Sequence, residues 1–134
     1  METELFTVET GSNLVTDVTD VVAAFCQDRG DGLCHAFAPH ATAGLALMEL
    51  GSGSEQDLGH VVEQLLPRDD RYRHQHGSRG HGADHLLPVF VQPSLVLPVL
   101  GGRLQLGTWQ SVVIVDPNVD NTHRQLRCSW LPGS

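Results

Sequence analysis

The sequence predicts an α+β fold: a single domain over residues 1–134, with a mostly antiparallel sheet and helices packed on it. Two observations support this class. Helical spacing of apolar residues appears in the first two thirds of the chain, whereas the last third is rich in strand patterns. With 134 residues, the chain is long enough to bury one core. It contains no repeat or linker, which favours a single domain.

The first fifty residues contain strand and helix patterns in turn. Residues 3–10 alternate loosely, like a strand near an edge, and residues 33–38 are typical of a short buried strand. Between them a helix is predicted from Thr16, with Thr16 or Asp17 as its cap and Gly30 or Gly32 as its end. Its apolar face would comprise Val18, Val21, Val22 and Phe25. The apolar run 39–50 is too short to assign to strand or helix.

Residues 54–67 predict a clearer helix. Ser54 and Asp57 occupy the positions of a capping box, and Pro67 ends the pattern. The apolar stripe expected to be buried is Leu58, Val61, Val62, Leu65 and Leu66. Residues 68–84 carry seven charged groups, three Gly and three His, so we expect a loop that is disordered unless a ligand orders it.

The C-terminal third predicts a short helix and then strands. The helix is expected over residues 84–92, where Pro88 is tolerable in the first turn. Residues 94–99 and 103–116 flank the turn "LGG" as a hairpin, and residues 122–131 form a last strand with Leu126, Cys128 and Trp130 on one face. In "LGTWQ" a kink could lie beside a site, or a bulge could place Trp109 in the core.

Composition excludes several classes of protein. Sixteen acidic residues oppose eight arginines, and the net charge of −8 disfavours nucleic-acid binding. No apolar run is long enough for a membrane span, and the N-terminus lacks the pattern of a signal peptide, so we expect a cytoplasmic protein with no membrane partner. The three cysteines, Cys26, Cys34 and Cys128, lie among apolar residues, and their spacing matches no cysteine motif for metal binding. Both observations favour buried free thiols.

The segment 72–85, "YRHQHGSRGHGADH", holds four of the eight histidines. Neutral imidazole is a ligand for divalent transition metals, but spacings such as H-x3-H between His81 and His85 are not specific, and a His-rich loop is the alternative. His40 strengthens the metal hypothesis because it ends a predicted buried strand, where a side chain can be held rigidly. A structural role for His40 is equally compatible with its position.

Five segments occur in the order and spacing of a known family. They are "HATAGLALME" (40–49), "YRH" (72–74), the isolated His85, "PSLVLPV" (93–99) and "GRLQLGTWQ" (102–110). In these segments the chain resembles the YjbQ family, known as secondary thiamine-phosphate synthase, over nearly its whole length. The resemblance implies a β-sandwich-like α+β fold that assembles as a homotrimer, with sites near the subunit boundaries.

The resemblance also implies a site. It places His40, His74 and His85 on a divalent metal, with zinc expected and Mg, Fe or Ni open. It gives Glu49, Gln110 and Ser94 as catalytic residues and Thr108, Arg124 and Asp57 as substrate-binding residues. His76 and His81 are then expected to be loop residues that line the entrance.

The implied reaction joins a pyrimidine pyrophosphate to a thiazole phosphate and releases pyrophosphate. A site of three histidines and water equally fits metal-assisted hydrolysis of a small phosphorylated substrate. The further alternative is a non-catalytic trimer that binds a metal or ligand. Met48 and Leu87, which stand where the family commonly has Asn and a basic residue, favour that last alternative.

Overall fold

The computed structural model describes residues 1–74 and 77–134. His76, expected at the entrance of a site, lies outside the described residues. The helices are α1 (Thr19–Cys26), α2 (Ser54–Leu65), α3 (His81–Asp84) and α4 (Leu87–Phe90). The strands are β1 (Glu2–Glu9), β2 (Val15–Asp17), β3 (Gly32–Phe37), β4 (Gly44–Met48), β5 (Ser94–Leu100), β6 (Arg103–Leu104), β7 (Ser111–Val115) and β8 (His123–Pro132).

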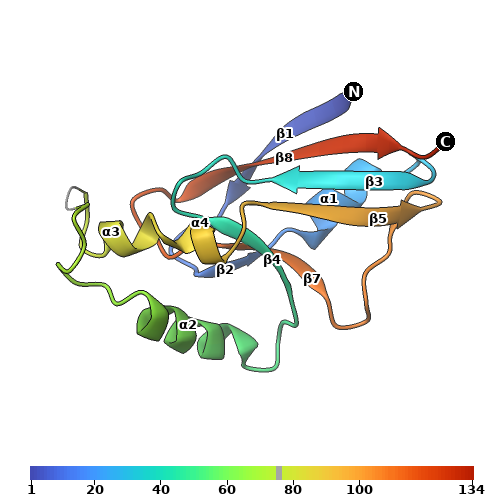
Figure 1. Ribbon diagram of the computed structural model, residues 1–134. Coiled ribbons are helices and arrows are strands. Elements are labelled where there is room, and N and C mark those ends of the chain that lie inside the picture. The colour runs from blue at the N-terminus through green and yellow to red at the C-terminus, as the bar shows by residue number, and fades with distance from the viewer. Residues whose placement is uncertain (75–76) are drawn as a thin grey trace.

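The strands form two antiparallel sheets, which confirms the predicted α+β class. The larger sheet has the order β1-β8-β3-β5-β6, and the smaller has the order β2-β7-β4 (Figure 1). The β5–β6 hairpin turns at Gly101 and Gly102, both with positive φ, as the "LGG" pattern predicts. Both termini lie at one end of the molecule, and α3 lies at the other (Figure 1).

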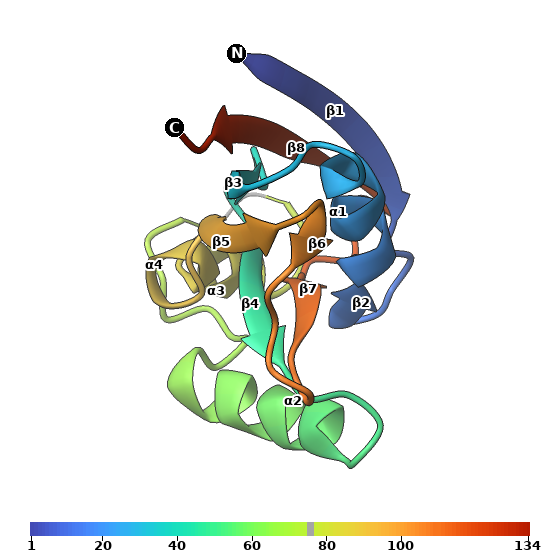
Figure 2. The same cartoon turned by 90° about the vertical axis from the view of Figure 1, so that its right-hand side faces the viewer.

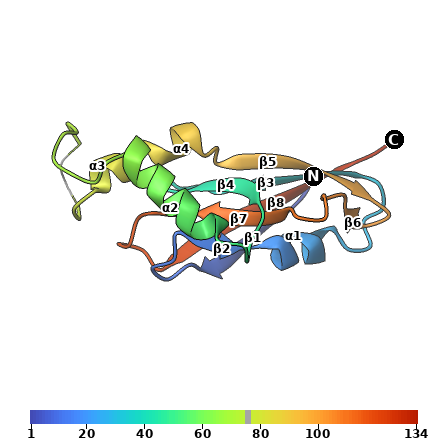
Figure 3. The same cartoon turned by 90° about the horizontal axis from the view of Figure 1, so that it is seen from below.

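The smaller sheet lies between two apolar layers. Val112 and Ile114 of β7 belong to the core shared with the larger sheet and α1, whereas Val113 and Val115 contact the layer that contains Leu66 and Leu87. Figure 2 shows this sheet between the larger sheet and α2, and in Figure 3 α2 lies in front of β4 and β7. Burial on both faces explains why β7 is a continuous apolar run rather than an alternating one.

The first helix begins later and ends earlier than predicted. The backbone of residues 15–17 pairs with β7, so the helix cannot include Thr16 or Asp17. Asp17 instead accepts hydrogen bonds from the Thr19 amide at 2.9 Å and from the Thr19 hydroxyl at 2.6 Å, just before α1 begins. After Cys26 the chain leaves the helix, and Asp28 adopts a positive φ of 64°.

The ambiguous run 39–50 contains strand β4. Leu45 donates its backbone N–H to the carbonyl of Gln92 at 2.7 Å, which ties the start of β4 to the segment before β5. A Cβ at Gly44 would lie 1.9 Å from the carbonyl oxygen of Val91, so only glycine fits there. At the end of "ATAG" the backbone of Gly44 therefore lies directly against the backbone of Val91.

Helix α2 corrects two details of the prediction. Its N-cap is Gly53 in the left-handed conformation, and no side chain caps the helix, so the capping box of Ser54 and Asp57 does not form. The predicted buried stripe is also too wide. Leu58 and Val62 pack against the smaller sheet's layer, but Val61 and Leu65 are 56% and 50% exposed. Of the helices in the part of the chain that is described, none has the length and apolar character to cross a membrane.

The predicted long strand 103–116 is two strands in different sheets. β6 belongs to the larger sheet and β7 to the smaller one, so the chain leaves extended pairing between them to cross from one sheet to the other. In this crossing Gln110 accepts a hydrogen bond from the Gly107 amide at 2.8 Å. Trp109 is 72% exposed, so the alternative that placed it in the core was wrong.

Candidate metal centre

Two histidines lie one helical turn apart at α3. The His85 amide donates to the carbonyl of His81 at 3.1 Å, so the helical backbone continues from His81 to His85. Residues four positions apart share one face of a helix. The two rings accordingly meet, with 2.8 Å between their Nε2 atoms.

The third histidine comes from the segment that packs against α3. A Cβ at Gly82 would lie 2.6 Å from the carbonyl oxygen of His74 and 2.7 Å from Cβ of Tyr72. Glycine at this position therefore lets residues 72–74 approach the helix closely. The Tyr72 hydroxyl donates to the carbonyl of Pro67 at 2.7 Å and holds this segment in place.

The three rings form a compact cluster, named here the three-histidine cluster (His74, His81 and His85). The ring centroid of His85 lies 4.1 Å from that of His74 and 4.5 Å from that of His81. One nitrogen from each ring lies within 4.8 Å of the others. Neutral imidazole nitrogens are ligands that divalent transition metals prefer, and three of them gather at this point. The donor set therefore fits a metal.

Polar groups pack around the cluster, some buried and some exposed. Asp84, 1% exposed, pairs with the guanidinium of Arg68 and accepts a hydrogen bond from the Asn118 amide at 3.0 Å. Asp120 lies 3.3 Å from Nδ1 of His81 and accepts a hydrogen bond from Ser78 at 3.0 Å. That hydrogen bond from Ser78 is the main cause that lowers the pKa of Asp120. These contacts join α3 to the loop between β7 and β8.

A small polar cavity adjoins the cluster. It measures about 130 Å³, and its lining includes His74, His81, Ser78 and Arg79. Asp69 and Asp70 also line it, and Arg71 pairs with Asp69 at 2.8 Å. A guanidinium and a hydroxyl beside imidazoles are groups that can receive a phosphate.

His40 is not among the three clustered rings. Its Nε2 accepts a hydrogen bond from the amide of Gln125 on β8 at 2.8 Å. Burial lowers the pKa of His40, and the positive charge of Arg124 lowers it further. His40 is thus held as a neutral ring at β8, and its place on a metal with His74 and His85 stays a prediction.

Arg124 is engaged with the protein itself. Its Nε and Nη2 donate to Asp116 at 2.6 and 3.1 Å, and Nη2 also donates to Thr42 at 2.8 Å. Arg124 and Asp116 are each 4% exposed. This buried pair ties β8 to the "ATAG" segment, and substrate binding by Arg124 stays a prediction.

The other expected site residues are spread over the molecule and do not line the cavity at the cluster. Glu49 follows β4 and accepts a hydrogen bond from Ser52 at 3.0 Å. Asp57 is exposed on α2, and Ser94 begins β5. Thr108 and Gln110 are exposed in the crossing between the sheets. Their predicted roles therefore stay predictions.

The sequence predicts His81 only as a loop residue at the entrance, and it does not predict Asn118 or Asp120 near the cluster. The H-x3-H spacing of His81 and His85 was a usable signal, because a single helical turn at that point brings the two rings together. Asn118 and Asp120 gave no local signal, since they are 33 or more residues further along the chain. Only the tertiary structure brings the β7–β8 loop to α3.

The cysteines are free and buried, as predicted. A hydrogen bond with Cys128 is the largest cause that raises the pKa of Cys34, to about 12, and a hydrogen bond with Cys34 raises the pKa of Cys26. Protonated buried thiols are poor nucleophiles and poor metal ligands. Chemistry is therefore better sought at the histidines.

Comparison with known proteins identifies the family. A sequence model described as UPF0047 protein YjbQ-like matches residues 4–133. The chain belongs to the YjbQ-like UPF0047 family. A UPF0047 protein of Mycobacterium tuberculosis is 56% identical over 133 residues, which is 99% of this chain and 100% of that protein. A UPF0047 protein of Archaeoglobus fulgidus is 33% identical over 82% of this chain and 86% of its own length.

Solved structures agree with this family assignment. A hypothetical protein from Aeropyrum pernix superposes with a TM-score of 0.87 at 31% identity, covering 99% of this chain and 100% of its own. A conserved hypothetical protein from Thermus thermophilus gives a TM-score of 0.84 at 29% identity, over 96% of this chain and 99% of its own. The resemblance to YjbQ proteins inferred from the five segments is confirmed, and so is the fold that it implies.

Proposed function

We propose that this YjbQ-like protein binds a divalent transition-metal ion through His74, His81 and His85 and acts there on a small phosphorylated substrate. The observation that carries the proposal is the convergence of three imidazoles with ligand atoms within 4.8 Å. Three nitrogen ligands with room for a further group are the pattern of catalytic zinc sites. Zinc is the favoured ion, because Mg²⁺ prefers oxygen ligands.

The substrate class follows from the groups beside the cluster. Arg79 and Ser78 line the cavity at His74 and His81. A guanidinium can hold a phosphate by two parallel hydrogen bonds. When bound, the metal would polarise a phosphoryl oxygen as a Lewis acid. Arg79 would orient the phosphate, and the three imidazoles would fix the ion beside it.

The specific reaction proposed is the one that the family resemblance implies. A pyrimidine pyrophosphate is joined to a thiazole phosphate, and pyrophosphate leaves. Because the leaving group gains negative charge, positive groups aimed at it lower the barrier. Arg79, which lines the cavity at the cluster, is the group proposed for this role.

A second candidate is a non-catalytic metal-binding protein. The observation that favours it is that Glu49, Ser94 and Gln110, the expected catalytic residues, do not line the cavity at the three-histidine cluster. Leu87 favours it as well, because this side chain is 1% exposed in the apolar layer against β7 and presents no charge to a phosphate.

Self-association as a homotrimer is part of the same proposal. Leu33 and Phe37 of β3 face outward from the larger sheet, and register places Val96, Leu131 and Leu5 on the same side. These five side chains are 37–59% exposed. The register also places His35 and Arg127 on this face, and exposed apolar side chains gathered on one face favour an interaction surface.

Metal content tests the ligand set. We expect tag-free wild-type protein, dialysed against Zn²⁺, to retain about one zinc per chain, and His81→Ala and His85→Ala to fall below about 0.1. His60→Ala, on the exposed side of α2, is the control and should retain zinc. Loss of zinc in His40→Ala with full retention in His81→Ala would contradict this set and favour His40, His74 and His85.

Complementation tests the reaction. A strain that lacks thiamine-phosphate synthase should grow without thiamine when it expresses the wild-type chain, and His85→Ala should abolish the rescue. Expression of both proteins is verified by immunoblot. Equal rescue by the wild type and His85→Ala would show that the reaction does not need the metal. If the wild type binds zinc but does not rescue growth, the non-catalytic candidate is favoured.

A further inference from the structure

The loop between β7 and β8 contacts the three-histidine cluster at Nδ1 of His81. Asp120 of this loop lies 3.3 Å from Nδ1 of His81, and Nδ2 of Asn118 lies at 3.3 Å from the same atom. Nε2 of His81 faces His85 at 2.8 Å. The two nitrogens of one ring therefore meet two different environments.

The protons of Asn118 decide which partner His81 uses. Its amide nitrogen carries two hydrogens. It donates to Asp84 at 3.0 Å and lies 3.4 Å from Asp120. Ionised carboxylates are stronger acceptors than a neutral imidazole nitrogen. If both amide hydrogens are assigned to carboxylates, rather than one to Nδ1 of His81, Nδ1 carries its own proton and Asp120 is the acceptor 3.3 Å away.

Asn118 is itself fixed in this orientation. It is 2% exposed, its backbone amide donates to Asp116 at 3.0 Å, and its side-chain oxygen accepts from the Asp120 amide at 3.0 Å. The side-chain amide cannot turn around without losing this last bond and its bond to Asp84. The loop thus holds an acceptor, the carboxylate of Asp120, near Nδ1 of His81.

We infer that Asp120 is the positioning residue of this centre: it accepts the Nδ1 proton of His81 and so keeps the Nε2 lone pair directed at the metal position. Asn118 supports it by holding the loop against α3. The inference rests on the proposed metal site, and it adds a residue that the resemblance does not assign. In metal-binding histidines a carboxylate on the second nitrogen fixes the tautomer and raises ligand basicity.

The tautomer itself gives a test that needs no metal. In metal-free protein labelled with ¹⁵N, long-range ¹H–¹⁵N spectra report which ring nitrogen of His81 is protonated. We expect Nδ1–H in the wild type, with Nε2 accepting from His85, and a shift toward Nε2–H in Asp120→Ala. A wild-type His81 that is protonated on Nε2 at neutral pH would overturn the inference.

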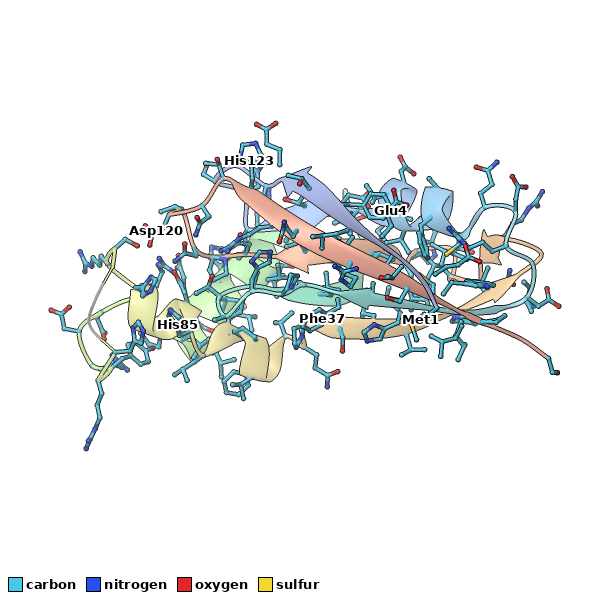
Figure 4. All side chains as sticks on the ribbon, turned by 90° about the horizontal axis from the view of Figure 1, so that it is seen from above. Met1, Glu4, Phe37, His85, Asp120 and His123 are labelled. Carbon is cyan, nitrogen blue, oxygen red and sulfur yellow. The ribbon has the colours of Figure 1, made fainter. Side chains whose placement is uncertain are left out.

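Metal affinity gives the second test. Competition with a zinc chelator should show affinity lowered about 10- to 100-fold in Asp120→Ala, the range found when such a partner is removed. Asp120→Asn should fall in between, because its amide oxygen can still accept the proton. The matched control is Glu4→Ala, which removes the same charge at the other end of the molecule from His85 and Asp120 (Figure 4).

The outcomes separate the two proposals. If wild type binds no zinc but His81 is an Nδ1–H tautomer that depends on Asp120, the metal proposal fails and the positioning contact stands. If zinc binds and Asp120→Ala retains affinity within about threefold while Glu4→Ala behaves identically, the inference fails. Thermal melting of Asp120→Ala and Asp120→Asn equal to that of the wild type verifies that the fold is intact.

Discussion

Arg124 is a buried charged residue whose partners all belong to the protein itself. It is buried on β8, and its guanidinium is shared between the carboxylate of Asp116 and the hydroxyl of Thr42. A buried charge requires such partners, because desolvation costs several kcal/mol for each ion. His40 lies next to this pair, with its ring bonded to the backbone of Gln125. One structural unit therefore joins β8, the end of β7 and the "HATAG" segment.

Removing this arginine should destabilise the fold. Arg124→Ala leaves Asp116 as an unpaired buried carboxylate, so we expect the free energy of unfolding to fall by about 3–5 kcal/mol. Arg127→Ala, on the same strand but bonded to Thr3 at the surface, should cost about 1 kcal/mol or less. Urea denaturation measures both. An Arg124→Ala protein with unchanged stability and lost activity would show that substrate binding is its role instead.

Among the secondary-structure elements, β7 buries its apolar residues, whereas α2 leaves two of its apolar residues exposed. One face of β7 packs against the core shared with the larger sheet. The other face packs against the apolar layer that contains Leu66 and Leu87. α2 packs through only part of its stripe, because the smaller sheet offers a narrow surface of β2, β7 and β4. The same residue types are therefore core in one element and surface in the other.

Paired truncations distinguish these environments. Ile114→Ala on β7 should cost about 2–5 kcal/mol, because the cavity adds to the lost transfer free energy. Val61→Ala on α2 and Trp109→Ala in the crossing between the sheets should change stability by about 0.5 kcal/mol or less. Thermal and urea unfolding check all three. A large loss for Trp109→Ala would mean that this ring is covered in the assembled protein.

For the whole molecule, the exposed apolar side of the larger sheet predicts association of identical chains. Phe37→Glu combined with Val96→Asp places two charges on that face, one on each of two neighbouring strands. We expect the mass in light scattering to fall from three chains to one chain of 14.5 kDa. Glu4→Ala serves as the control. A wild-type protein that is monomeric at high micromolar concentration would contradict the homotrimer.

Much of the fold could be predicted from the chain, but less of the site. The patterns at β1, β3, β5 and β8 predicted strands that the structure contains, because alternation and turn glycines are local signals. The division of residues 103–116 between two sheets could not be predicted, since both parts have the same strand-like composition. The family resemblance groups His74 and His85 with His40, whereas the approach of Asp120 to His81 depends on a contact across 39 positions in the sequence.

The sequence by itself determined the class of fold, the family and the presence of a histidine-rich segment. These properties rest on residue type and short spacing, which the chain carries before it folds. The tertiary structure decided which histidine rings lie together. His81 joins His74 and His85 because α3 and the close approach at Gly82 bring their rings together. His40 instead binds the backbone of β8, because β3 ends beside that strand.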